Sequence, residues 1–530
     1  MQASKAAHDG TKLFDGADWD FPMLQRISDA CEEIAFGELG LNCYPNQIEV
    51  ITAEQMLDAY SSVGMPLFYK HWSFGKHFAQ QEAMYRKGYM GLAYEIVINS
   101  SPCISYLMEE NTATMQTLVI AHAAFGHNHF FKNNYLFKQW TDAEGILDYL
   151  DYAKKYIAKC EEKYGYNEVE RTLDAAHALM GQGVFRYPQK KKLNLKEEKE
   201  RAEKRREYVQ SSFNELFSRM VPASKQQEEL KDVSKRRVLL GLPQTNVLYF
   251  LEKSAPRLKS WQRELLRIVR HVAQYFYPQS QTKVMNEGTA TYVHYKIMTR
   301  LYELGKISEG NFLEFLQSHT NVVFQPEFDD QRFRGFNPYA LGFAMMQDIE
   351  CIVTGIDERG VPFTEEQLDE NREWFPDIAQ KGDPMGVLRH IWANYRDESF
   401  ISQFLSPRLM RRMKMFHLCD DPVVEEGILV NKIHNERGYR EVRRQLARNY
   451  DVGYVDLNIE VTDVDLAGDR ELILQHKVLD GAMLSGENAA PVLTHLANLW
   501  SYNVKLEEVD ALDDVLEEHF AEPSYVQESA

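Results

Sequence analysis

The sequence predicts a mainly α-helical protein: a large helical domain followed by a small C-terminal α+β module. Two observations lead to this prediction. Apolar residues recur every three or four positions over most of residues 20–445, and every second position in two segments after residue 450. The length of 530 residues is also greater than that of a typical single domain.

Capping boxes indicate where several helices of the large domain begin. In each box a threonine precedes a glutamine or glutamate by three residues, so that each side chain can bond to the other's backbone N–H. The pairs are Thr52 with Gln55, Thr141 with Glu144, and Thr364 with Gln367. The clearest helical period lies in SWQRELLRIVRHVAQYFYP, where Pro278 is expected to stop the helix.

The C-terminal module is predicted to have the order ββαβ. Apolar residues alternate with polar ones from Val455 to Val461 and again from Leu472 to Val478, as in half-buried strands. A helical segment, NAAPVLTHLANLW, and a closing strand, NVKLEEV, follow. The predicted organisation is a flexible N-terminus at 1–20, a helical body at 21–445, an acidic module at 446–515 and an acidic tail at 516–530.

The net charge is concentrated at one end of the chain. The formal charge is −19, and residues 451–530, with 18 acidic and 3 basic residues, carry −15 of it. This acidity makes nucleic-acid binding unpromising and points to a docking surface or to pairing within the chain. A basic stripe precedes the module on one helical face, and it either pairs with the module, is solvated, or docks a partner. Its members are Arg437, Arg440, Arg444 and Arg448.

The body contains one highly charged insertion, at residues 190–207. It has nine basic and five acidic residues among eighteen, with hardly an apolar side chain to bury. A solvated helical or flexible insertion is the expected structure, and a nucleic-acid contact is the alternative.

The sequence also bears on the cellular compartment. The N-terminus has no signal-peptide pattern, and no run of eighteen apolar residues occurs, so a cytoplasmic protein is expected. The six cysteines are scattered without a CxxC pair and are expected to be reduced thiols.

Three histidines in AHAAFGHNHF form the densest group of potential metal ligands: His122, His127 and His129. No pair among them has the i, i+4 spacing with which two imidazoles on a regular helix share an ion. Two of them could still share one if Gly126 breaks or bulges the helix. The alternative is that all three are core histidines satisfied by hydrogen bonds.

A second candidate segment is VMNEGTATYVHYKI. Its NEGxA pattern resembles the segment that supplies the carboxylate ligand in gluzincin metallopeptidases, and Glu287 would be that ligand of a zincin-like site. The HExxH motif of those enzymes, whose glutamate is the general base, is missing. Another group must therefore activate water, and the candidates are Glu95, Glu110 and His294. Glu95, with Asn99 one helical turn away, and Glu110 could instead be ordinary surface or helix-end charges.

Longer blocks of the chain are similar to the stage V sporulation protein R (SpoVR) family over about residues 15–510. They include AYEIVINSSPCISYLMEENT, AHAAFGHNHFFKNN, VMNEGTATYVHYKIM and YRDESFISQFLSPRLM. The resemblance implies a cytoplasmic bacterial protein, linked to the spore cortex in spore formers. In other bacteria it implies stress and stationary-phase programmes together with a PrkA-type serine kinase and a von Willebrand-like partner. It does not imply an established reaction.

Two compatible hypotheses follow. In the first, the protein is a regulatory component that works with the kinase, and it carries a bound divalent metal such as zinc. In the second, it is a metal-dependent hydrolase of a peptide or amide bond, for example in cell-wall precursors, with His122, His127 or His129, and Glu287 as ligands.

Overall fold

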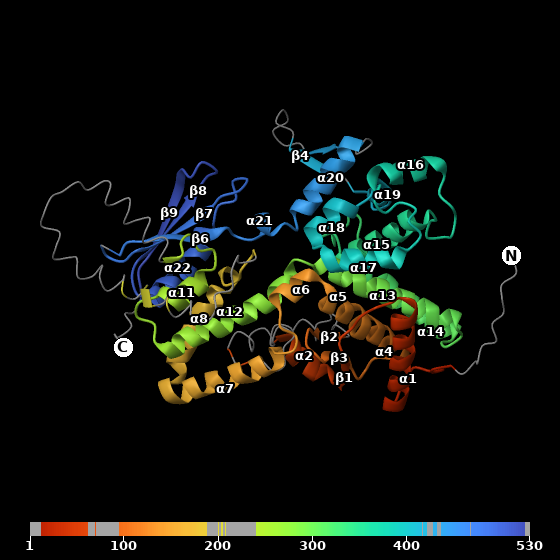
Figure 1. Cartoon of the computed structure of the whole chain (residues 1–530), viewed down its shortest axis with the longest axis horizontal. Helices are drawn as coiled ribbons and strands as arrows, with labels where there is room; N and C mark the ends of the chain where they lie inside the picture. The colour runs from red at the N-terminus through yellow and green to blue at the C-terminus, as the bar shows by residue number, and fades with distance from the viewer. Residues whose placement is uncertain are drawn as a thin grey trace, which may run out of the picture. The chain divides into compact units, whose positions relative to one another are not determined.

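A computed structural model shows a mostly helical chain that ends in a small sheet-containing module, as the sequence predicts (Figure 1). It describes residues 12–61, 69, 71, 95–187, 200, 203, 204, 207, 240–415, 417–420, 428–431, 436–466 and 468–524. Contacts divide the chain into two interleaved units. Unit 1 comprises residues 1–151 and 278–451, and unit 2 comprises residues 152–277 and 452–530.

Unit 1 contains most of the helices and a small sheet. In chain order its elements are α1 (Phe21–Glu32), the π-helix η1 (Glu33–Glu38), β1 (Asn46–Ile51), α2 (Ala53–Ser61), β2 (Glu95–Ile98), β3 (Cys103–Met108), α4 (Ala113–Ile120), the π-helix η2 (Ala121–His127), α5 (Asn128–Asn133), α6 (Tyr135–Trp140), α13 (Lys283–Glu303), α14 (Glu309–Val322), α15 (Pro338–Thr354), α16 (Glu365–Trp374), α17 (Pro384–Asn394), α18 (Asp397–Phe404), α19 (Pro407–Arg412), β4 (His417–Asp420), β5 (Ile428–Asn431) and α20 (Glu436–Arg448). Helices α7 (Ile146–Tyr164) and α12 (Ser260–Ser280) pass from one unit to the other.

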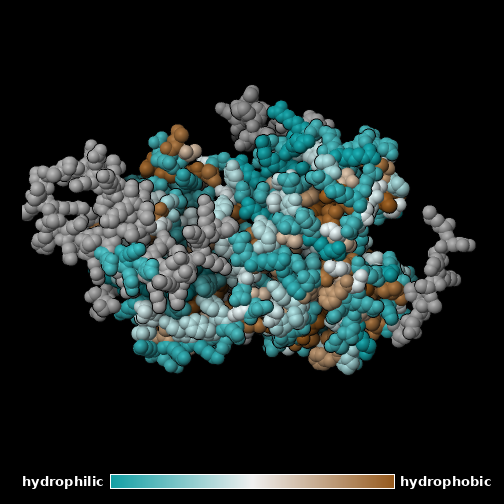
Figure 2. Space-filling model, in the orientation of Figure 1, coloured by the Kyte–Doolittle hydropathy of each residue, from teal (hydrophilic) through white to brown (hydrophobic). Residues whose placement is uncertain are grey.

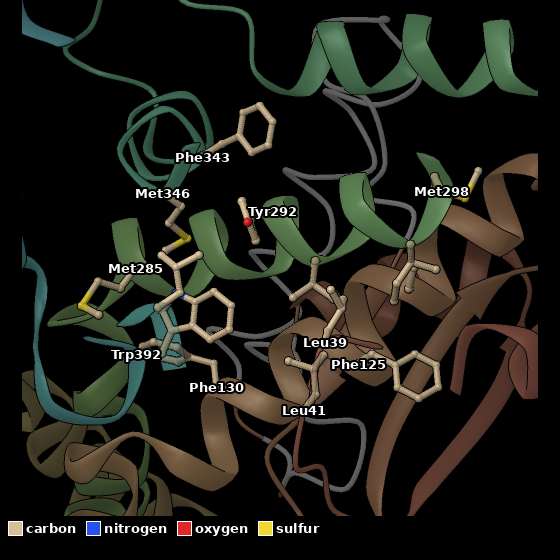
Figure 3. Packing of buried hydrophobic residues seen from close by; sticks show 14 of the residues in the cluster. Leu39, Leu41, Phe125, Phe130, Met285, Tyr292, Met298, Phe343, Met346 and Trp392 are labelled. Carbon is tan, nitrogen blue, oxygen red and sulfur yellow. The ribbon is translucent and has the colours of Figure 1, made fainter. Parts of the chain in front are cut away.

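Helix α13 is the central helix of unit 1. It packs against α15 on one side and against η2, α4 and α5 on another (Figure 1). Its buried side chains include Met285 and Tyr292, which lie among Phe130 and Trp392 from neighbouring elements (Figure 3). Each large apolar side chain buried in this way contributes about 1.5–3 kcal/mol to folding. The functional candidates on η2 and α13 are therefore mounted on the most deeply packed part of the unit.

Glycine allows α13 to approach its neighbours closely. A Cβ on Gly126 of η2 would lie 2.5 Å from the Cα of Ala290, and a Cβ on Gly288 would lie 2.6 Å from the Cα of Gly342 on α15. These distances are far shorter than any ordinary contact between carbon atoms. Only glycine at these positions permits the observed spacing of η2, α13 and α15.

The sheet of unit 1 has the strand order β1-β3-β2, with β1 parallel and β2 antiparallel to β3. Glu95 therefore lies at the start of a strand, and the helix implied by placing Asn99 one turn away is wrong. The segment forms a strand because its own residues favour one: Ile96, Val97 and Ile98 are β-branched and pack well on a pleated surface.

Unit 2 contains helices and the sheet of the C-terminal module. Its elements are α8 (Tyr166–Ala178), the 3₁₀ turn η3 (Met180–Gln182), α11 (Val247–Ser254), α21 (Val452–Val455), β6 (Ile459–Val464), β7 (Leu472–Lys477), α22 (Gly486–Trp500), β8 (Val504–Val509) and β9 (Val515–Ala521). The strand order is β6-β7-β8-β9.

The predicted ββαβ order is present as β6, β7, α22 and β8, with two differences. Residues 452–455 form the short helix α21, in which the Gly453 carbonyl accepts a hydrogen bond from the Asn458 amide, so the first strand starts later than predicted. Residues 515–521, assigned mostly to an acidic tail, form β9, because they pair with β8 in antiparallel register. The predicted domain boundaries themselves remain a prediction.

The predicted helix ends are partly confirmed. Thr52 and Thr364 form the expected capping boxes with Gln55 and Gln367. The Thr141 hydroxyl instead donates to the carbonyl of Phe137, and α7 begins only at Ile146. Helix α12 continues through Pro278 to Ser280, since a proline removes only one intrahelical bond and the helix ends within its next turn.

Some predictions concern segments outside the described residues. They are the first eleven residues of the predicted flexible N-terminus and most of the charged insertion at 190–207, of which only residues 200, 203, 204 and 207 are described. Among the described residues, no helix combines the length and apolar character needed to cross a bilayer.

We predict that Gly126→Ala lowers the free energy of unfolding by about 1–3 kcal/mol, because the new methyl group must displace the backbone of α13. Gly37→Ala is the matched control: Gly37 also lies in a π-helix, η1, and a Cβ there meets nothing within 4 Å. Urea denaturation of both variants measures the difference. Equal stabilities would show that the close approach is not a constraint.

Candidate metal centre

The π-helix η2 brings His122 and His127 onto one face. Hydrogen bonds of a π-helix run from residue i to residue i+5, so side chains five apart share one face, much as those four apart do on an α-helix. The two imidazole ring centroids are 4.7 Å apart. The helix bulge that Gly126 was expected to permit is therefore present, and it lies over Ala290 of α13.

The first turn of α13 is held by a buried carboxylate from α18. Asp397 accepts hydrogen bonds from the backbone N–H groups of Val284 and Met285, at 2.8 Å each. A carboxylate at this position satisfies N–H groups that have no partner within the helix. This contact fixes the direction in which the next two residues, Asn286 and Glu287, leave the helix.

Four side chains from three elements converge: Glu95 from β2, His122 and His127 from η2, and Glu287 from α13. The Nε2 atom of His122 lies 3.2 Å from Oε1 of Glu95 and 3.9 Å from Oε2 of Glu287. The Nε2 atom of His127 lies 3.5 Å from Oε2 of Glu287 and 3.9 Å from Oε1 of Glu95. We call these four residues the buried cluster.

The other nitrogen of each imidazole in the buried cluster has an outer partner. Nδ1 of His127 lies 2.9 Å from Oδ1 of Asn286, an acceptor, so Nδ1 carries the proton and the lone pair of Nε2 faces the carboxylates. Nδ1 of His122 lies 2.8 Å from Nδ1 of His294, whose Nε2 lies 2.9 Å from Nδ1 of His319. Histidines that ligate metals have such outer partners, which fix the ring orientation and the tautomer.

Burial controls the charges of these groups. Burial, followed by repulsion from Glu287, raises the pKa of Glu95 well above its ordinary value. Burial and the neighbouring imidazoles lower the pKa values of His122 and His294, and burial lowers the pKa of His319 to about 4. These three imidazoles are therefore neutral at pH 7, and a ligand histidine must be neutral.

The donor set of the buried cluster fits a divalent metal ion. Ligand atoms of Glu95, His122 and His127 all lie within 4.8 Å of one another, and Glu287 reaches both imidazoles. Two oxygens, Oε2 of Glu95 and Oε2 of Glu287, are buried without a hydrogen-bond partner among the described residues. Imidazole nitrogen and carboxylate oxygen are ligands of zinc and related ions, which would also relieve the repulsion between two close carboxylates.

Two predicted site residues lie elsewhere. His129 lies two residues beyond His127, on another face of the helix, because each α-helical residue turns the side chain by about 100°. Its Nδ1 accepts a hydrogen bond from the Asn42 backbone N–H at 2.8 Å, and its ring packs edge-on against Trp392. Glu110 is exposed and accepts from the backbone N–H of Ala53. The structure brings neither residue to the buried cluster.

The sequence pattern gives no signal for His319, because it comes from α14, outside any motif, and meets His294 only through helix packing. Asn286 could have been identified, since it precedes Glu287 in the NEGxA segment. Its role depends on the tautomer of His127, which a linear pattern does not reveal.

Comparison with known proteins gives matches over nearly the whole chain. The family described as "SpoVR like protein" matches residues 18–455, and the family described as "SpoVR-like C-terminal domain" matches residues 457–511. The chain is 52% identical over 500 residues to a protein of Escherichia coli (strain K12) named "Uncharacterized protein YcgB", covering 94% of each chain. No solved structure matches the chain.

We predict that His129 makes stability depend on pH. Burial lowers the pKa of His129 to about 4, whereas an unfolded histidine titrates near 6.5. Between these values the unfolded chain binds a proton that the folded chain does not, so the free energy of unfolding falls as the pH falls from 6.5 to 4. The loss amounts to at most about 3 kcal/mol.

His129→Gln tests this prediction, because glutamine still offers an acceptor to Asn42 but does not titrate. Urea denaturation of the wild type and the variant at pH 7.5, 6 and 4.5 is the measurement. The variant should lose less stability than the wild type over this range. Parallel losses would contradict the assignment to His129.

Proposed function

Because this chain belongs to the SpoVR family, whose match spans every residue of the buried cluster, we propose a function for that cluster. The protein is a divalent-metal-dependent hydrolase of a peptide or amide bond. His122, His127 and Glu287 hold the ion, and Glu95 is the general base. The proposed substrates are peptides of cell-wall precursors, and the support for this class is the link to the spore cortex that the family resemblance implies.

One observation carries this proposal: two Nε2 atoms with outer partners on their Nδ1 atoms face two carboxylates in a buried site. A cluster that served packing alone would not need two unpaired carboxylate oxygens, since a buried oxygen without a hydrogen bond costs about 1–3 kcal/mol. When bound, a divalent ion supplies Lewis-acid polarisation and lowers the pKa of water.

Glu95 is suited to moving a proton. Its Oε1 lies 3.2 Å from Nε2 of the proposed ligand His122, so its carboxylate borders the place where the ion would lie. It can take a proton from the attacking water and return it to the leaving amine. Its side chain is 18% exposed, as is that of Glu287.

The arrangement also accounts for the missing HExxH motif. In HExxH the two histidines share an α-helical face, and the intervening glutamate is the base. In this chain a π-helix gives His122 and His127 a common face at a spacing of five, and Ala123 follows His122. The base therefore comes from a different element, the strand β2.

We predict that the purified protein binds one Zn²⁺ in the buried cluster, and that His122→Ala and Glu287→Gln each lower the zinc content by one ion per chain. His129→Gln is the matched control and retains the ion, because His129 lies outside the cluster. Asn286→Ala removes an outer partner and weakens the affinity by about 10–100-fold. Equilibrium dialysis followed by elemental analysis measures both content and affinity.

Turnover is tested on the same zinc-loaded proteins with peptidoglycan stem peptides, with product detection by mass spectrometry. Glu95→Gln should keep the ion and lose hydrolysis. Release of the ion by Glu95→Gln but not by Glu287→Gln would contradict the roles given to the two carboxylates. Binding of zinc by the wild type without cleavage of any stem peptide would refute this substrate class.

A second function, compatible with the first, is a regulatory one. The protein acts in the cytoplasm with a PrkA-type serine kinase and a von Willebrand-like partner in stress, stationary-phase or sporulation programmes. Family membership supports this proposal, and α20 offers a surface for it. Arg437, Arg440 and Arg444 are exposed there, although Arg440 also pairs with Glu436 and Arg444 with Glu441.

We predict that the full chain captures a purified PrkA-type kinase, and that the double variant Arg437→Glu, Arg444→Glu weakens the capture because it reverses the charge of this face. Arg359→Glu is the control, an exposed arginine on a different segment. Surface plasmon resonance at two salt concentrations measures the effect. Unchanged capture by the double variant would remove α20 from this role, and no capture by the wild type would refute the partnership.

A further inference from the structure

The C-terminal sheet contains a second group of histidine and carboxylate side chains. In the sheet register, His476 of β7 stands opposite Glu508 of β8, and Glu508 stands opposite Glu517 of β9. Side chains directly opposite each other on neighbouring strands lie on the same face, about 4.5–5.5 Å apart at Cβ. His519, two residues after Glu517, shares this face. We call these four residues the sheet cluster.

The contacts within the sheet cluster centre on Glu508. Its Oε1 lies 2.8 Å from Nε2 of His519, and its Oε2 lies 3.0 Å from Nδ1 of His476. The backbone N–H of Leu484 donates to the same Oε2 at 3.0 Å. Ligand atoms of Glu508, Glu517 and His519 all lie within 4.8 Å of one another.

The carboxylate of Glu508 is fully buried, which is rare for a group that carries a charge. The side chain of Glu508 is 0% exposed, and that of His476 is 4% exposed. A buried negative charge needs positive charge close by, and residues 451–530 contain only 3 basic residues against 18 acidic ones.

Apolar burial does little to hold strand β9 on the sheet. It is an edge strand, and most of its side chains are exposed. Leu516 and Phe520, which alternate with Glu517 and His519, are 51% and 61% exposed. Figure 2 shows an apolar area over this sheet. Burial of apolar side chains therefore contributes little to holding β9 in the sheet. Its backbone bonds to β8, the Lys505–Glu518 ion pair, the contacts with α22 and the sheet cluster hold it there.

We infer that the C-terminal module binds its own divalent transition-metal ion, with Glu508, Glu517 and His519 as ligands and His476 as the outer partner that orients Glu508. One imidazole nitrogen and two carboxylate oxygens form a donor set that zinc and related ions accept. The ion supplies the positive charge that the module lacks and ties β9 to β8. This site is separate from the buried cluster of unit 1 and does not depend on the hydrolase proposal.

The full-length protein tests this inference. Chelator-treated protein is dialysed against Zn²⁺, and the ions bound per chain are counted for the wild type, His519→Ala, His122→Ala and the double variant. We expect two ions for the wild type, one for each single variant and none for the double variant. If the buried cluster binds no ion, the wild type binds one, His122→Ala changes nothing, and His519→Ala still removes one, so failure of either site is distinguishable.

Matched controls address unspecific binding and misfolding. His495→Ala removes a histidine of α22 outside the sheet cluster and should leave the count unchanged. Glu517 is exposed, so Glu517→Gln should spare the fold and weaken the affinity by more than about tenfold, whereas Glu518→Gln, on the opposite face and paired with Lys505, should not.

Hydrogen exchange tests whether the ion holds β9 against β8. Zn²⁺ should slow amide exchange in residues 515–521 of the wild type but not of His519→Ala, and circular dichroism confirms that both chains are folded. An unchanged ion count in His519→Ala would overturn the inference. It would identify the sheet cluster as a hydrogen-bonded network of one carboxylate and two imidazoles.

Discussion

The close approach of η2 and α15 to α13 is the constraint on which the structure of unit 1 depends. Gly126 meets Ala290, and Gly288 meets Gly342, at distances that leave no space for a Cβ. Gly288 directly follows Glu287, and Gly126 directly precedes His127. The residues that bring the helices together are thus neighbours of those that form the buried cluster, so the packing of the core and the geometry of the cluster cannot change independently.

How far the sequence predicts this protein depends on whether a feature is local. The helical body, two capping boxes and the strands β7 and β8 follow from periodicity and side-chain preference within a few residues. The strand at Glu95 was misassigned, and β9 was missed. In Glu95–Ile98 the β-branched residues give a local signal for a strand, but in β9 most side chains are exposed and pairing with β8 decides the conformation.

The same distinction applies to the buried cluster. His122, His127, Glu287 and Glu95 were all among the sequence candidates, because histidine density and the NEGxA pattern are visible in the chain. What the sequence left open was which histidine pairs with His122. The π-helix brings His127, and not His129, next to His122, and the Nδ1 atom of His129 bonds to the backbone of Asn42. His319 could not be predicted, since only the packing of α14 against α13 brings it to His294.

The interleaving of the two units orders their completion during synthesis. Unit 1 has all of its residues once position 451 has been translated, so the buried cluster can assemble while the ribosome is still making the C-terminal sheet. Unit 2 has to wait. Its helix α8 packs against α22, which is translated after all of unit 1, so one face of α8 stays uncovered until then. Nascent chains that stop between residue 451 and α22 would carry a finished unit 1 together with an uncovered face of α8, and exposed apolar surface is what chaperones bind.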